Sequence, residues 1–222
     1  MKNEEYQTKI ERAAKNKRNK TGHLYFGDKV AKVLIKKTKH FLAGPVLDIG
    51  AGTGALIQEL QNNGYQNIKG IDLYPKEDFI NKGVITDLQF EDSSFKTVFC
   101  TEVIEHLTEE QIDMGLREVY RVLADNGFFV LSVPFNEVLE KNIYTCPHCG
   151  GQFHKVGHLQ SFSKERLISL LKKYGFSIQK SGVYAFGVMS KIPFGAHLNW
   201  LFKKLKYEAI SKSILVVCKK LH

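Results

Sequence analysis

Hydrophobic and polar positions follow one another along this chain in blocks typical of strands that alternate with helices. Short apolar runs at 46–49, 97–101 and 127–133 have the composition of strands buried on both faces of a sheet. Residues 109–124 instead repeat apolar side chains at helical spacing. Such alternation predicts a doubly wound α/β fold with right-handed connections between its parallel strands.

The two ends of the chain extend this pattern. Segments 5–18 and 27–41 predict basic amphipathic helices ahead of the first strand. Segments 176–184 and 213–219 predict the last two strands, and the apolar and basic residues at 199–207 predict a helix between them.

A glycine-rich turn follows the first predicted strand. Asp48 lies near the end of that strand, and Gly50, Gly52 and Gly54 follow at alternate positions before a helix-like segment. Glycines permit a tight turn and the close approach of a ligand, and the free N–H groups of the next helix face that ligand. The spacing differs from the G-x-G-x-x-G fingerprint of dinucleotide sites, which disfavours a nicotinamide dehydrogenase.

Three stretches resemble the class I S-adenosylmethionine (SAM)-dependent methyltransferases. The first is the glycine turn at 48–54, and the second is an apolar strand that ends in Asp72. The third is 87–95, Asp-Leu-Gln-Phe-Glu-Asp-Ser-Ser-Phe, in which Gln89 replaces the usual proline. The resemblance is close over 40–135 and looser beyond it.

The resemblance implies a Rossmann-like, seven-stranded, mostly parallel sheet with an antiparallel last strand, preceded by N-terminal helices. It assigns Asp72 to the ribose hydroxyls, and Asp87 and the Leu88 backbone to the adenine. Ten residues are thereby expected to contact SAM: Asp48, Gly50, Ala51, Gly52, Gly54, Asp72, Leu73, Asp87, Leu88 and Thr101.

Composition fits one domain over 1–222, with 43% hydrophobic residues and neither a membrane-spanning apolar run nor a signal-peptide core. We expect it to carry basic helices at 1–42, a Cys/His loop insertion at 140–160 and a helical insertion at 185–212. The net charge of +9 is concentrated at the two ends, since 1–40 holds 12 Lys/Arg against 4 Asp/Glu. Basic ends suit RNA or an anionic membrane surface, and equally suit solvated helix faces.

Two of the four cysteines form a Cys-x-x-Cys pair at Cys146 and Cys149, which His154 and His158 follow. This spacing is compatible with a tetrahedral zinc knuckle, and the alternative is a reduced loop without metal. Four cysteines, two of them in a Cys-x-x-Cys pair, suit a reducing compartment better than a disulfide-bonded protein. We therefore expect a cytoplasmic protein, either free or peripheral to a membrane.

A second constellation follows the strand at 97–101. Glu102, Glu105 and His106 stand at i, i+3 and i+4, so a helix would present them on one face, and His158 is the expected fourth member. This set can hold a divalent metal or supply a general base. Glu-x-x-Glu-His with a distant His resembles quinone-precursor O-methyltransferases and, more weakly, small-RNA 2′-O-methyltransferases, whereas metal-free methyltransferases also carry the motif.

The resulting interpretation is a SAM-dependent methyltransferase of a small-molecule acceptor, with a hydroxyl oxygen as the methylated atom. Glu102, Glu105, His106 and His158 are the expected catalytic residues. The alternatives are an RNA 2′-O-methyltransferase, a metal-free enzyme with a carbon, nitrogen or oxygen acceptor, and a non-catalytic SAM- or zinc-binding module that interacts with RNA.

Overall fold

The computed structural model describes residues 27–147, 149–186 and 212–221. The predicted helices at 5–18 and 199–207 lie outside these residues. The seven strands of the main sheet are β1 (Val46–Ile49), β2 (Ile68–Asp72), β3 (Ile80–Lys82), β4 (Phe95–Thr101), β5 (Leu123–Pro134), β8 (Phe176–Tyr184) and β9 (Ser213–Lys220). The α-helices are α2 (Asp28–Thr38), α3 (Ala55–Asn62), α4 (Glu109–Val122) and α5 (Lys164–Lys173). Short 3₁₀ turns are η1 (Lys39–Phe41), η2 (Ile104–His106) and η3 (Leu139–Asn142), and β6 (Ile143–Thr145) with β7 (Gln152–His154) forms a separate hairpin.

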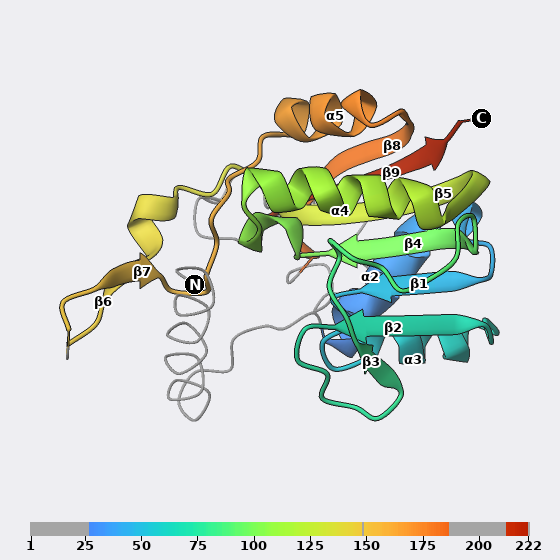
Figure 1. Cartoon of the computed structure of the whole chain (residues 1–222), viewed down its shortest axis with the longest axis horizontal. Helices are drawn as coiled ribbons and strands as arrows, with labels where there is room; N and C mark the ends of the chain where they lie inside the picture. Colours follow the sequence, from blue (N-terminus) through green and yellow to red (C-terminus); the bar gives the residue numbers. More distant parts are fainter. Residues whose placement is uncertain (1–26, 148, 187–211, 222) are drawn as a thin grey trace, which may run out of the picture.

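The strand order of the main sheet is β3-β2-β1-β4-β5-β9-β8. Strands β1 to β5 pair in parallel, whereas β9 pairs antiparallel with both β5 and β8. This confirms the predicted sheet, including its antiparallel last strand. The arrowheads of β2 and β4 point toward the side where the β6–β7 hairpin lies, and β9 points the opposite way (Figure 1).

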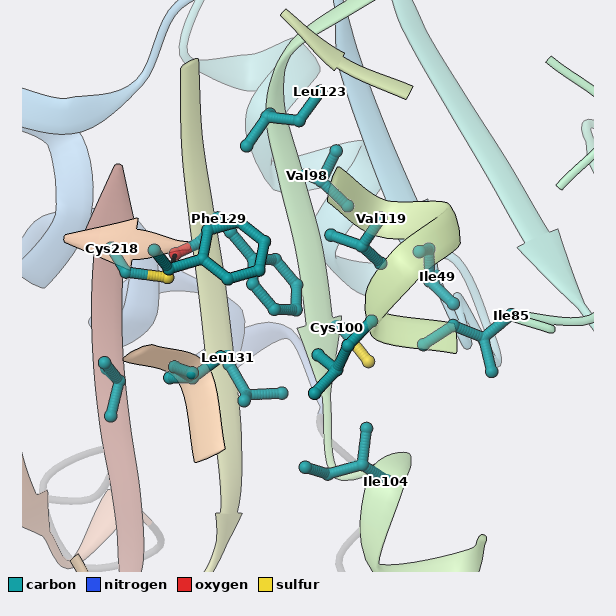
Figure 2. Packing of buried hydrophobic residues seen from close by; sticks show 14 of the residues in the cluster. Ile49, Ile85, Val98, Cys100, Ile104, Val119, Leu123, Phe129, Leu131 and Cys218 are labelled. Atoms are coloured by element: carbon teal, nitrogen blue, oxygen red, sulfur yellow. Dashed lines mark hydrogen bonds between the residues drawn. The ribbon is translucent and has the colours of Figure 1, made fainter. Parts of the chain in front are cut away.

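Helices cover both faces of the sheet. On one face, α2 and α3 pack Val30, Leu34 and Leu56 against strand residues that include Phe99 and Val130. On the other face, α4 and α5 pack against the alternate residues of the same strands. Figure 2 shows Val119 of α4 beside Val98 and Ile49. The central strands therefore need apolar side chains on both sides, which explains the continuous runs in the sequence.

Element boundaries differ from the sequence prediction at a few points. The predicted helix at 27–41 is α2 followed by the 3₁₀ turn η1, and α4 ends at Val122 because Leu123 already adopts the extended backbone of β5. Cys100 and Cys218 are buried core residues, as expected. Among the described helices, none is both long and apolar enough to cross a lipid bilayer.

Candidate active site

The glycine turn lies at the carboxyl end of β1 and contacts the segment that follows β4. Gly50, Gly52 and Gly54 all have positive φ, a conformation that side chains strain. A Cβ atom at Gly50 would lie 2.4 Å from Val103 Cγ2, so that position has no room for a side chain. At Gly52 the nearest atom would be the Gly50 carbonyl oxygen at 3.9 Å, which leaves open space beside this residue for a ligand.

Asp48 is buried beneath this turn, and its Oδ1 has no hydrogen-bond partner among the described residues. Burial, with the nearby charge of Asp72, raises the pKa of Asp48 to about 7. A buried carboxyl with one unpartnered oxygen beside an open glycine turn fits a cationic ligand, such as the part of SAM that carries the ammonium and sulfonium groups.

Asp72, at the end of β2, is held by the backbone. Its Oδ2 accepts the Gly52 N–H at 2.8 Å and its Oδ1 accepts the Tyr74 N–H at 2.8 Å. Each carboxylate oxygen keeps a further lone pair, so the arrangement fits two ribose hydroxyls. The next residue, Leu73, is 41% exposed and offers apolar surface there.

The remaining predicted SAM residues differ in exposure. Ala51 and Thr101 are buried at the carboxyl ends of β1 and β4, and Asp87 is exposed with its Oδ1 accepting from Gln89.

Leu88 requires a correction, because its N–H donates to Glu118 at 2.8 Å and its carbonyl accepts from Arg121 at 2.8 Å. With both backbone groups used and its side chain buried, Leu88 is a core residue and no adenine-binding donor.

The segment after β4 is not an α-helix, so the condition under which Glu102, Glu105 and His106 would share one helical face is not met. Glu102 adopts positive φ, and only Ile104–His106 forms a helical turn, of the 3₁₀ type. Glu102 accepts a hydrogen bond from Ser132 at 2.9 Å, directed toward β5. Burial raises its pKa, and hydrogen bonds from Ser132 and Ser213 offset part of this rise.

Three of the four predicted catalytic residues converge. Ligand-type atoms of Glu105, His106 and His158 all lie within 4.8 Å of one another, and Glu102 is outside this group. Glu105 is fully buried, and neither of its carboxylate oxygens has a hydrogen-bond partner among the described residues. Its carbonyl oxygen accepts the N–H groups of Leu159 and Gln160, which places the loop containing His158 against η2.

The surroundings of Glu105 and His106 favour the neutral form of both side chains. Burial, reinforced by Glu102, raises the pKa of Glu105 well above its usual value. Burial, with the neighbouring His158, lowers the pKa of His106 to about 4. A buried acid and two imidazoles at the carboxyl end of β4 can share protons with an acceptor or hold a divalent cation.

A second group consists of Glu137, His154 and His158, again with ligand-type atoms within 4.8 Å of one another. Glu137 was missed in the sequence, where it has no periodic or motif partner. It reaches His158 because the chain after β5 runs beside the chain before α5, with the Asn136 N–H donating to the Phe162 carbonyl at 2.9 Å.

The predicted zinc knuckle is not assembled. Among the described residues, neither group of potential metal ligands contains Cys146 or Cys149. The reason is the hairpin register, in which His154 pairs with Ile143 whereas both cysteines lie in the turn beyond Thr145. Three residues of strand separate Cys146 from the level of His154, about 10 Å at the usual rise per residue.

Comparisons with known proteins relate this chain to methyltransferases. Residues 2–181 match a family model described as a methyltransferase domain. Over 145 residues, 62% of this chain and 38% of the relative, the sequence is 28% identical to a sterol 24-C-methyltransferase of Yarrowia lipolytica. It is 43% identical over 58 residues to EEF1A lysine methyltransferase 2 of Mus musculus, 25% of this chain and 24% of that protein. The chain thus spans well under half the length of these relatives.

Solved structures share the fold at low sequence identity. One is a SAM-dependent methyltransferase from Archaeoglobus fulgidus, with a TM-score of 0.61, 18% identity and coverage of 87% of this chain and 95% of that one. Another is a Burkholderia thailandensis 1,6-didemethyltoxoflavin-N1-methyltransferase with bound S-adenosylhomocysteine (TM-score 0.59, 15% identity, coverage 87% and 77%).

Proposed function

Since the chain belongs to the class I SAM-dependent methyltransferases, we propose that it methylates a hydroxyl oxygen of a small-molecule acceptor. The observation that carries the proposal is the convergence of Glu105, His106 and His158 beside the glycine turn. The link between the two is the contact of Val103 with Gly50.

When bound, SAM would supply an electrophilic methyl group that a nucleophile can take in line, with the thioether sulfur as the leaving group. The protein has to orient the acceptor and remove its proton. Asp48, Asp72 and Gly52 would hold the cofactor, for the geometric reasons given above. His158 would accept the hydroxyl proton of the acceptor as its oxygen takes the methyl group.

Glu105, His106 and His158 also fit a divalent cation. Two imidazoles and a carboxylate are a common ligand set, and a cation would compensate the buried Glu105 oxygens that lack partners. Such a cation would lower the pKa of the acceptor hydroxyl. The Cys146→Ser/Cys149→Ser double variant should keep any bound metal, whereas His158→Gln should lose it, as measured by elemental analysis of the purified proteins.

The acceptor chemistry is tested with SAM carrying a labelled methyl group and three ring probes: phenol, catechol and aniline. We expect label on oxygen for phenol or catechol and none on aniline, identified by mass spectrometry of the products. Label on aniline alone would overturn the assignment of an oxygen acceptor.

Variants of the cluster test the site itself. Glu105→Gln and His106→Gln should each lower turnover about 10²–10⁴-fold, the usual contribution of a general acid or base. Calorimetry should give unchanged SAM affinity, because neither residue belongs to the glycine turn. Full turnover in both variants would make the cluster structural.

A further inference from the structure

Glu137 lies behind His158 and is surrounded by hydrogen-bond donors. It contacts His158 Nδ1 through Oε2, and its Oε1 accepts from Asn142 Nδ2 at 2.9 Å. His154 Nε2 lies 3.3 Å from the same Oε1. The Ser161 hydroxyl donates to the Glu137 carbonyl at 2.7 Å, which ties the two loops together.

Both oxygens of the Glu137 carboxylate face side-chain nitrogens, with His158 Nδ1 at Oε2 and Asn142 Nδ2 at Oε1. A carboxylate can only accept hydrogen bonds, so the proton between the two residues belongs to His158 Nδ1.

The hydrogen-bond partners of His154 and His106 indicate which nitrogen carries the proton in each neutral ring. His154 Nδ1 accepts the backbone N–H of His158 at 3.1 Å, so the proton of the neutral His154 ring is on Nε2, facing Glu137. His106 Nδ1 lies 3.3 Å from the Gly157 carbonyl oxygen, which can only accept. Neutral His106 and neutral His158 therefore both carry their proton on Nδ1 and a lone pair on Nε2.

His158 belongs to both groups of potential metal ligands, the one with Glu105 and His106 and the one with Glu137 and His154. Its ring packs edge-to-face against His106 with centroids 4.7 Å apart, and stacks on His154 at 4.8 Å. The His154 ring is only 2% exposed, so it forms a fixed support for both His158 and Glu137.

We propose that Glu137 is a positioning residue that fixes the Nδ1–H tautomer and ring orientation of His158, so that the Nε2 lone pair is available to the acceptor site. Histidine bases and histidine metal ligands both need this support, so the proposal holds whichever role His158 has. It rests on the proposed function only for the use of His158 in turnover.

The decisive variant is Glu137→Gln, which keeps the shape of the side chain. Its amide N–H₂ can donate to His158 Nδ1, which would move the ring proton to Nε2. The matched control is Glu140→Gln, which removes the same charge from an exposed position three residues away. Circular dichroism and thermal unfolding check that both variants fold.

The direct readout is the tautomer of His158. Long-range ¹H–¹⁵N spectra of the histidine-labelled 222-residue chain should show the Nδ1–H form for the wild type and Glu140→Gln, with the signal assigned through its loss in His158→Gln. Glu137→Gln should show the Nε2–H form. The Nε2–H form in the wild type, or an unchanged tautomer in Glu137→Gln, would overturn the proposal.

Kinetics supply a second readout with the acceptor found for the wild type. We expect kcat to fall at least 100-fold in Glu137→Gln, with SAM affinity and acceptor KM within twofold of the wild type and Glu140→Gln unaffected. An unchanged kcat would overturn the proposal. If the wild type methylates no hydroxyl probe, the proposed function fails, but the tautomer measurement still decides the role of Glu137.

Discussion

At the level of single residues, burial couples the protonation of Asp48 to the stability of the fold. Its carboxyl is buried with one oxygen unpartnered, and its pKa is about 7 instead of 3.8. The folded chain therefore binds this proton more tightly than the unfolded chain does. Protonation of Asp48 therefore contributes to the free energy of unfolding. This contribution is fully present below pH 3.8, the pKa of Asp48 in the unfolded chain, and is lost as the pH rises through about 7.

We therefore expect Asp48→Asn, which mimics the protonated acid, to remove this pH dependence. The difference in unfolding free energy between wild type and variant, from urea denaturation without SAM, should change between about pH 5 and pH 8 in the direction of a less stable wild type. Parallel curves for the two proteins over this range would contradict the raised pKa of Asp48.

Single residues also mark the limit of the sequence prediction. Asp48 and Asp72 could be singled out as candidates because each lies at or next to the end of an apolar run, and their assignment to SAM stays a prediction. Glu137 could not, because its partner is 21 residues away along the chain and only the pairing of two loops brings them together. Leu88 was assigned to adenine because its sequence position gives no sign that Glu118 and Arg121 use its backbone groups.

At the element scale, α4 holds the loop between β3 and β4 through one arginine. Arg121 donates to the carbonyl oxygens of Leu88 and Phe90, each at 2.8 Å, and forms ion pairs with Glu118 and Asp92. A lysine cannot reproduce this forked set of contacts. The loop carries Asp87, so its position bears on the cofactor site.

Arg121→Lys should accordingly destabilise the protein by about 1–3 kcal/mol, the range for hydrogen bonds to charged groups, and weaken SAM binding. Arg117→Lys is the matched control one helical turn earlier, since Arg117 is exposed and pairs only with Asp113 among the described acids. Thermal unfolding and calorimetry measure both effects. Equal behaviour of the two variants would show that the Arg121 contacts do not hold the loop.

Elements were predicted well where burial on both faces fixed them and poorly where the backbone departs from regular geometry. The strands at 176–184 and 213–219 match β8 and β9 within one residue. At 102–106 the shared face of Glu102, Glu105 and His106 required a helix, and only Ile104–His106 forms a turn, of the 3₁₀ type. The left-handed backbone of Glu102, which decides the outcome, leaves no mark in the pattern.

At the scale of the whole molecule, a ligand at the ends of β1, β2 and β4 joins separate strands and should stabilise the fold. S-adenosylhomocysteine at 100 times its Kd should add about 2.7 kcal/mol, or about 5–10 °C in Tm for a domain of this size. Gly52→Ala should abolish this response in differential scanning fluorimetry by placing a methyl group in the ligand space.

Gly64→Ala is the control for backbone strain. Gly64 also has positive φ, at +89°, and a Cβ there would meet nothing within 4 Å. It should lower the Tm of the free protein as Gly52→Ala does, yet keep the full shift on ligand addition. Loss of the shift in both variants would mean that strain, not occupied ligand space, explains the result.

The segment between β5 and α5, which carries the β6–β7 hairpin, contributes residues to the proposed acceptor site and none to the proposed SAM site. Every side chain proposed to hold SAM precedes β5, and so do Glu105 and His106 of the proposed acceptor site, whereas Glu137, His154 and His158 follow it. Substitutions or exchanges within 136–162 should therefore change acceptor binding more than cofactor binding. For protein engineering, this segment is the natural unit to transplant into another methyltransferase of the same fold.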